Sequence, residues 1–429
     1  MSSYVPSRKV LALAGVLALG AVALGEDDGV RRILVDRQLN TTEVELTSID
    51  EGEVHWVDGA GRERSRAIEE LLAVIDPDGG LLPPGVRRQV IESLNFPLVE
   101  TTDGQRLLAR LRNDPEASEE FVELLLVGGQ TMRVAIDRIA GLTAARSVFD
   151  EGRGARPSGT IVDDVVQLTN GDRVAGFVES LGNGVSIEVE GVSRQIPLSN
   201  IASIELANPA RAGEGTRVWL DDGSIVGAGP ISGAGERLVA FDLTLARENA
   251  GEKSGSEASM SNASMRMPLS RIAGIVFDAG GAGVRPLAGM SPASFEPTGS
   301  RRWTPPPVTG DSGQAVLGAS TIELPGPMRV RWTLPEGATR LAGVATLGDT
   351  PGAWADCGVV IVLDGGGQQL ELARARLRPG EDEMAFNLEL PPGLSGEART
   401  LEVRVEAGAY GPIQDRVLLE RVLLLVERE

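Results

Sequence analysis

The chain has 429 residues, a formal net charge of −20 at pH 7, one histidine and one cysteine. The negative charge argues against nucleic acid and anionic membrane surfaces as partners, because both are bound largely through basic side chains. The single histidine argues against histidine-dependent catalytic triads and multi-histidine metal sites, and the single cysteine excludes an internal disulfide.

The first residues have the pattern of a signal peptide. Arg8 and Lys9 precede an unbroken apolar run over 10–24, and small residues at 23–25 offer a cleavage site. We therefore expect residues 1–25 to be a signal peptide and the protein to be exported to the periplasm, the cell surface or the medium. The apolar run is shorter than the about 20 residues of a membrane span, so an uncleaved anchor is the alternative.

A short phrase recurs at intervals of roughly 60–70 residues, which is the pattern of a repeated structural unit. In each copy, polar or turn-forming residues lead into a short aliphatic run; the copies are 66–74, 134–142, 196–204 and 267–275. We expect the corresponding units to span 30–76, 97–145, 160–208 and 215–278. The last of these carries a polar insertion at 249–265, which we expect to be a flexible hairpin extension.

The third unit shows the pattern of an SH3-like or Sm-like barrel most clearly. Its apolar residues alternate through three strands, and Asn170-Gly171 is the pair preferred in a two-residue type I′ hairpin. A fourth strand, one helical turn and a last short strand complete the unit. Asp103-Gly104 and Asp222-Gly223 stand at the same place in the second and fourth units. The first unit has no such glycine, so whether it is a complete barrel stays open.

The C-terminal part has a different pattern. Residues 279–310 are rich in proline and glycine with little apolar periodicity, which predicts a linker. Residues 311–429 contain seven or eight alternating runs separated by turn clusters, which predicts a jelly-roll β-sandwich. The expected fold class is thus all-β, with several small SH3-like or Sm-like barrel repeats followed by a C-terminal jelly roll.

Several phrases of this last part resemble a known family. They are 332–349, beginning Trp-Thr-Leu-Pro-Glu-Gly-Ala-Thr, then 357–365, 377–381, 399–406 and the closing strand 417–426. Together they resemble the NPCBM-type carbohydrate-binding module first described in glycosyl hydrolase family 98, over roughly 318–427. That family usually has an Asp/His/Trp cluster before its last strand, whereas this chain has only Asp415 and Glu420 as acids there. The barrel repeats resemble uncharacterised segments of planctomycete-like exported proteins.

A sugar site needs an aromatic face for stacking and polar groups that reach hydroxyls. Trp354 and Tyr410 stand in glycine-rich loops of the predicted jelly roll, and we expect a ligand edge there, with Asp356 and Asp415. A structural cap made by these loop aromatics is the competing interpretation. Trp332 alternates with aliphatic residues and is expected in the core. No carboxylate set has the spacing of a metal site, so no metal or cofactor is expected.

These observations indicate a non-enzymatic exported binding or scaffold protein. Its partner would be a glycan or a protein of the cell envelope. His55 is expected on the surface of a strand, and Cys357 is expected to be a small buried residue without a base to activate it. Two alternatives stay open: a structural interaction protein of the cell envelope without a glycan site, and a carbohydrate-active enzyme with a carboxylate pair between units.

Overall fold

The computed structural model describes residues 30–427, except 51, 78, 80–85, 87, 89–90, 92–97, 112–119, 127–130, 145–161, 183, 212, 234–237, 246–263, 279–282, 300–301, 311–314, 349–353, 366–367, 393–397 and 412–414. The predicted signal peptide (1–25) and nearly all of the predicted insertion at 249–265 lie outside these residues. No helix in the described part of the chain is long and apolar enough to cross a bilayer.

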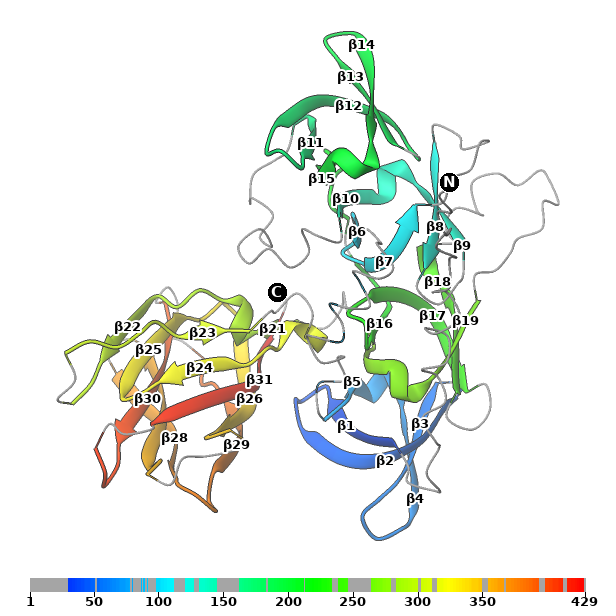
Figure 1. Ribbon diagram of the computed structural model, residues 1–429. Coiled ribbons are helices and arrows are strands. Elements are labelled where there is room, and N and C mark those ends of the chain that lie inside the picture. The colour runs from blue at the N-terminus through cyan, green and yellow to red at the C-terminus, as the bar shows by residue number, and fades with distance from the viewer. Residues whose placement is uncertain are drawn as a thin grey trace, which may run out of the picture.

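Within these ranges, four segments share one strand pairing, and we name them units one to four (Figure 1). In each unit the first strand pairs with the second and the fifth, and the third and fourth strands continue from the second. This is the strand order expected of an SH3-like or Sm-like barrel, and the all-β prediction is confirmed. The exact domain boundaries stay a prediction.

The elements of the units follow in chain order. Unit one contains β1 (Val30–Asp36), β2 (Thr41–Asp50), β3 (Glu53–Val57), β4 (Glu63–Ala67), the 3-10 helix η2 (Ile68–Glu70) and β5 (Leu71–Ile75). Unit two contains β6 (Leu98–Thr101), β7 (Arg106–Leu111), β8 (Phe121–Leu126), β9 (Thr131–Ala135), η3 (Ile136–Arg138) and β10 (Ile139–Thr143). Unit three contains β11 (Asp164–Leu168), β12 (Arg173–Leu181), β13 (Gly184–Val189), β14 (Val192–Pro197), η4 (Leu198–Asn200) and β15 (Ile201–Glu205). Unit four contains β16 (Thr216–Leu220), β17 (Ile225–Gly233), β18 (Leu238–Leu243), β19 (Ser264–Pro268), η5 (Leu269–Arg271) and β20 (Ile272–Val276).

The first hairpin of each unit differs from the predicted type I′ turn. In unit three, Gly171 N donates to Leu168 O at 3.0 Å and Leu168 N donates to Asp172 O at 2.8 Å. Asn170 keeps a negative φ and only Gly171 is left-handed, with φ 94°. The loop is therefore a type I turn followed by a left-handed glycine, since a type I′ turn needs two positive φ angles.

Unit one makes the same hairpin without glycine. Leu39 N donates to Asp36 O at 3.0 Å, and Asp36 N donates to Asn40 O at 3.0 Å. Leu39 takes the left-handed position with φ 58°, which costs a side-chain-bearing residue about 1–2 kcal/mol. Its side chain is only 2% exposed, and burial of a leucine offsets such a cost. Because unit one has no glycine at this position, its sequence did not predict the hairpin that it shares with the other units.

The fifth strands join the units in pairs. β5 pairs antiparallel with β20, and β10 pairs antiparallel with β15. β5 and β20 are buried at every position, which explains why their sequences are continuous apolar runs instead of alternating ones. Unit one is thus joined to unit four and unit two to unit three, and a bridge between β7 and β17 links the pairs.

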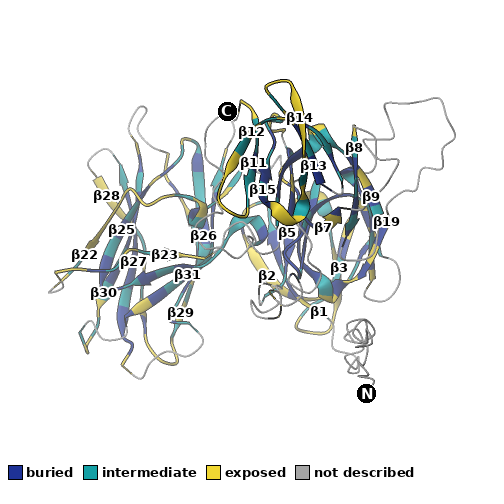
Figure 2. Ribbon diagram, turned by 45° about the horizontal axis from the view of Figure 1, so that its top comes forward, coloured by how far each residue is buried: buried dark blue, intermediate teal, exposed yellow. Residues whose placement is uncertain are grey.

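The remaining described residues form the predicted sandwich. In one sheet the strands follow one another in the order β23 (Val308–Thr309), β24 (Ile322–Pro325), β31 (Arg416–Val426), β26 (Ala338–Thr346) and β29 (Glu383–Glu389). The short strand β21 (Val284–Pro286) also pairs with β31. The other runs β22 (Ser294–Pro297), β25 (Met328–Thr333), β30 (Thr400–Ala407), β27 (Cys357–Gly365), β28 (Gln368–Leu377). We call them the β31 sheet and the β30 sheet. Their inner faces enclose one apolar core, in which Trp332 is 1% exposed, as expected (Figure 2).

The structure corrects the predicted linker at 279–310. Within it, β21 pairs with β31, β22 pairs with β25, and β23 pairs with β24. The 3-10 helix η6 (Leu287–Gly289) also buries Leu287 in the sandwich core. These strands are too short to show an alternating pattern. Their prolines are tolerated because the strands lie at the borders of the sheets, where an amide donor is not required.

The sandwich packs on units one and four through its β31 sheet. Ala342 of β26 and Leu423 of β31 share an apolar cluster with Val35, Leu72 and Ala273 of the units. The 3-10 helix η7 (Val316–Gly318) adds Val316 to the same cluster. Asn387 of β29 donates to Gln38 O at 3.1 Å and to Asn40 Oδ1 at 2.9 Å. The β30 sheet therefore lies on the side of the sandwich away from the units (Figure 1).

Candidate functional site

The candidate site lies at one end of the sandwich, where loops connect the two sheets. Trp354 precedes β27, and Tyr410 follows β30. Cys357 at the start of β27 is directly paired with Ala407 at the end of β30. This register brings two loops that are far apart in sequence to the same edge. We call Trp354, Tyr410, Asp356 and Arg376 the aromatic edge.

The two aromatic side chains of this edge touch and are both open to solvent. Their ring centroids are 5.2 Å apart with an interplanar angle of 84°, an edge-to-face contact. Trp354 is 55% exposed and Tyr410 is 51% exposed. Core aromatics of the same sandwich are far more buried, with Phe386 at 9%. A ligand can therefore reach this pair without any rearrangement of the core.

Asp356 holds the two loops in place from below. Its oxygens accept hydrogen bonds from Arg376 Nε and Nη2, both at 2.6 Å, and from Ala409 N at 2.7 Å. The Arg376 hydrogen bonds, followed by the Ala409 amide, lower the pKa of Asp356 to about 2. The side chain itself is 5% exposed. Asp356, predicted as a ligand contact, lies where it fixes the backbone next to Tyr410.

Arg376 is the polar group that the edge presents to solvent. Its side chain is 58% exposed although Asp356 binds it in a bidentate manner. Hydrogen bonding and the charge of Asp356 raise the pKa of Arg376, and Tyr410 adds to the effect. Because a guanidinium has five donors, Arg376 retains N–H groups for a ligand. Arg378 and Glu381 form a second bidentate pair in the next turn, at 2.8 and 2.9 Å.

Asp415, the other predicted contact, lies inside the fold. Its side chain is 3% exposed, and its charge contributes to the raised pKa of Cys357. Burial is the main cause of that shift and Asp356 adds to it, so the thiol pKa reaches about 12. Cys357 is 0% exposed. The structure thus brings Trp354, Tyr410 and Asp356 together at the edge and leaves Asp415 beneath it.

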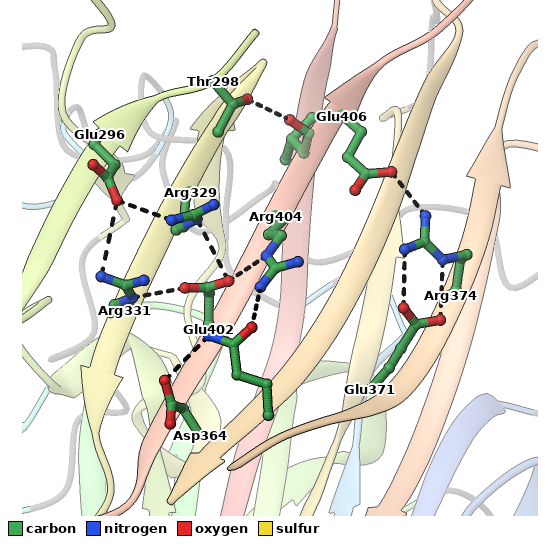
Figure 3. Close-up of polar contacts among 12 residues, drawn as sticks. Glu296, Thr298, Arg329, Arg331, Asp364, Glu371, Arg374, Glu402, Arg404 and Glu406 are labelled. Atoms are coloured by element: carbon green, nitrogen blue, oxygen red, sulfur yellow. Dashed lines mark hydrogen bonds and ion pairs between the residues drawn. The ribbon is translucent and has the colours of Figure 1, made fainter. Parts of the chain in front are cut away.

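Beyond the edge, the outer face of the β30 sheet is covered by ion pairs (Figure 3). Glu402 stands at their centre with a side chain only 1% exposed. It accepts hydrogen bonds from Arg331 Nε at 2.6 Å and from Arg404 Nε, and Arg329 lies 3.5 Å away. Burial disfavours the Glu402 carboxylate, but the arginine hydrogen bonds outweigh it and lower its pKa. Further along, Arg374 binds both Glu371 and Glu406.

A cavity of about 970 Å³ lies between unit one and the β31 sheet. Its walls include the apolar side chains of Ile33, Val316 and Phe386 and the carboxylates of Asp76 and Glu420. Asp76 accepts a hydrogen bond from Arg32 at 2.6 Å, and Arg421 lies 3.9 Å from Glu420. Both carboxylates thus have an arginine beside them. We place the candidate site at the aromatic edge, because it combines two exposed aromatic rings in contact with an exposed guanidinium.

The described residues contain no group of three or more histidine, cysteine, aspartate or glutamate side chains arranged to hold a metal ion. His55 lies on β3 with 37% of its side chain exposed, and Glu53 is 3.8 Å away. This is the strand-surface position that its sequence context predicts.

Sequence reasoning missed Arg376 and another exposed aromatic, Trp303, which is 72% exposed. Arg376 belongs to an alternating stretch on β28, in which Arg374 and Arg376 share the outer face. That alternation identifies an exposed face but not the partner of Arg376. Trp303 stands in the segment predicted to be a linker, where an exposed aromatic has no evident role.

No family model and no curated protein matches this chain. Several solved structures are similar to parts of it. The CBM51 of Clostridium perfringens GH95, in complex with methyl-galactose, is 12% identical, covers 33% of this chain and 99% of its own, and has a TM-score of 0.24. TmCBM61 in complex with β-1,4-galactotriose is 15% identical over 25% of this chain and 65% of its own, with a TM-score of 0.18. A CBM29-2 mutant complexed with cellulohexaose is 10% identical over 28% and 74%, with a TM-score of 0.17. Similarities of this size assign no function, and the resemblance to the family 98 module stays a prediction.

Proposed function

We propose that this chain is an exported, non-enzymatic glycan-binding protein whose C-terminal sandwich binds sugar at the aromatic edge. In this proposal, units one to four form a scaffold that displays the sandwich. The observation that carries the proposal is the contact between Trp354 and Tyr410, both about half exposed, above the Asp356–Arg376 ion pair.

The geometry of the edge suits a sugar ring for a physical reason. The C–H face of a pyranose is apolar and packs on an aromatic ring, while its hydroxyls need hydrogen-bond partners around the rim. Trp354 and Tyr410 supply the ring surfaces, and Arg376 supplies exposed N–H donors. The hydrogen bonds of Asp356 to Arg376 and Ala409 hold the site in one arrangement. Less conformational entropy is then lost when a ligand binds.

The protonation states at the edge favour binding over catalysis. A general acid must carry its proton near neutral pH, but the pKa of Asp356 is about 2. A cysteine nucleophile must be accessible as a thiolate, but Cys357 is buried and its pKa is about 12. Neither group next to Trp354 and Tyr410 is therefore suited to catalysis.

The two alternative functions, an interaction protein and a carbohydrate-active enzyme, would each use a different part of the structure. An interaction protein without a glycan site would use exposed apolar residues of the units, such as Phe177 on β12, which is 66% exposed. A carbohydrate-active enzyme would use the cavity beside unit one, where Asp76 and Glu420 are the described carboxylates. The aromatic edge is favoured because it combines stacking surface, exposed donors and fixed geometry in one place.

The test is a glycan array, followed by polysaccharide pull-down, with the mature full chain and a Trp354→Ala, Tyr410→Ala double variant. Phe177→Ala is the matched control, since it removes from unit three an aromatic ring that is at least as exposed as the two of the edge. We expect binding by the wild type and the control and none by the double variant. Absence of binding by a folded wild type, or retention by the double variant, would overturn the proposal.

A further inference from the structure

Trp303 is more exposed than the other tryptophans of the chain, at 72%. Single exposed apolar side chains are common on protein surfaces, so exposure alone assigns no role. Its position in the fold gives the second observation. Trp303 lies in the crossover from β22 to β23, and this crossover is at the same end of the sandwich as the aromatic edge.

The strand pairings show that the crossover with Trp303 and the aromatic edge lie at the same end of the sandwich. Pro297, the last residue of β22, is paired with Met328, the first residue of β25. Met328 is in turn paired with Val405, near the end of β30 from which the Tyr410 loop starts. In the opposite sheet, Pro325 at the end of β24 is paired with Arg416, at which β31 begins after the same loop.

The backbone that follows Trp303 is anchored to the sandwich. The next residue, Thr304, is 4% exposed and donates its hydroxyl to Pro325 O at 3.1 Å. Three prolines follow, at 305–307, and each fixes its own φ. On the other side, Thr298 N donates to Pro327 O at 3.3 Å. The chain directly after the indole is therefore anchored to the end of β24, which limits the conformational entropy lost when a ligand packs on Trp303.

The distance between the Trp303 segment and the start of β31 follows from the strand order. Thr304 is bound to the end of β24, and β24 is the immediate neighbour of β31. Neighbouring strands lie about 4.8 Å apart, so Thr304 stands roughly two strand widths, or about 10 Å, from Arg416, the first residue of β31. Trp303 therefore adds a second exposed aromatic surface at this end of the sandwich, beside the pair formed by Trp354 and Tyr410.

We propose that Trp303 is an outer stacking platform, so that this end of the sandwich binds an extended glycan chain and not a single terminal sugar. This inference rests on the proposed glycan-binding function. Sugar rings at one end of the chain pack on Trp354 and Tyr410, and a later ring of the same chain packs on Trp303.

The test compares ligand length between variants of the mature full chain. Isothermal titration calorimetry is run with cello-, chito- and β-1,4-galacto-oligosaccharides from disaccharide to hexasaccharide. We expect Trp303→Ala to weaken hexasaccharide binding about five- to tenfold, the size of an aromatic contact. Disaccharide affinity should be unchanged. Trp354→Ala should weaken both lengths, and Phe177→Ala should weaken neither.

The outcomes separate the two proposals. If the wild type binds a hexasaccharide no more tightly than a disaccharide, or if Trp303→Ala binds both as the wild type does, the extended site is overturned while the aromatic edge stands. If Trp303→Ala weakens both lengths equally, Trp303 supports the fold of the edge and the inference is also overturned. If the folded wild type binds none of these oligosaccharides and no glycan on the array, both proposals fall.

Discussion

Replacing Glu402 by glutamine tests whether the ion pairs on the β30 sheet stabilise the sandwich. The change keeps the shape of the side chain and removes a charge that is 1% exposed among Arg329, Arg331 and Arg404. Removing one partner of a fully buried ion pair costs about 3–5 kcal/mol. The three arginine side chains are 22–33% exposed and regain water, which lowers the cost.

Glutamine also keeps one oxygen that accepts a hydrogen bond from an arginine, worth about 1 kcal/mol. We therefore expect the free energy of unfolding of the sandwich to fall by about 2 kcal/mol. For a module of this size, that corresponds to a decrease in Tm of about 6 °C. Differential scanning calorimetry of the full chain at neutral pH measures the change.

Glu389→Gln is the matched control. Glu389 makes a 3.0 Å ion pair with Arg340 on the opposite sheet, but its side chain is 81% exposed. Exposed pairs contribute about 0–1 kcal/mol, so its Tm should change little. Equal shifts for the two variants would refute the argument from burial. The pH dependence gives a second check. Because the pKa of Glu402 is lowered in the fold, its contribution is present above the ordinary glutamate pKa of about 4.3 and is lost as the pH falls through the folded pKa.

Two further predictions concern Asp356 of the aromatic edge and its buried neighbour Cys357. Asp356→Asn should weaken glycan binding without direct ligand contact, measured as Kd for the best array ligand. The pKa of Asp356 is lowered to about 2 in the fold, so its carboxylate stabilises the protein above about pH 4 and loses this effect as the pH falls toward 2. The difference in Tm between the wild type and the variant should therefore be constant above about pH 4 and become small near pH 2. A difference that stays the same at pH 2 would contradict this reasoning. Cys357, with a thiol pKa of about 12 and 0% exposure, should react with a thiol reagent only after denaturation, and rapid labelling of the native chain would contradict its burial.

The amino-acid pattern predicted what depends on local sequence and missed what depends on long-range register. The glycine-rich contexts of Trp354 and Tyr410 predict loops, and both residues are in loops. Their contact depends on the pairing of Cys357 with Ala407, which no local pattern encodes. Arg376 meets Asp356 for a similar reason, because Gly358 is paired with Arg376.

Two other differences also have physical causes. Leu39 takes a backbone conformation that glycine ordinarily takes, because burial of its side chain offsets the strain. The strands at Val284–Pro286, Ser294–Pro297 and Val308–Thr309 are too short for a periodic signal. They are stabilised by neighbours that lie far along the sequence. A local pattern therefore predicts a linker where the fold has the borders of two sheets.

The way the sandwich is attached bears on how the aromatic edge can act. Its β31 sheet is occupied by units one and four, through Ala342, Leu423 and the Asn387 hydrogen bonds. Its β30 sheet has its own charges paired on the outer face, so little of that face attracts a further partner (Figure 3). The loop end carries Trp354, Tyr410 and Trp303, each more than half exposed, beside the exposed side chain of Arg376. If the aromatic edge binds glycan as proposed, the scaffold covers the β31 sheet and leaves this end of the sandwich open to the ligand.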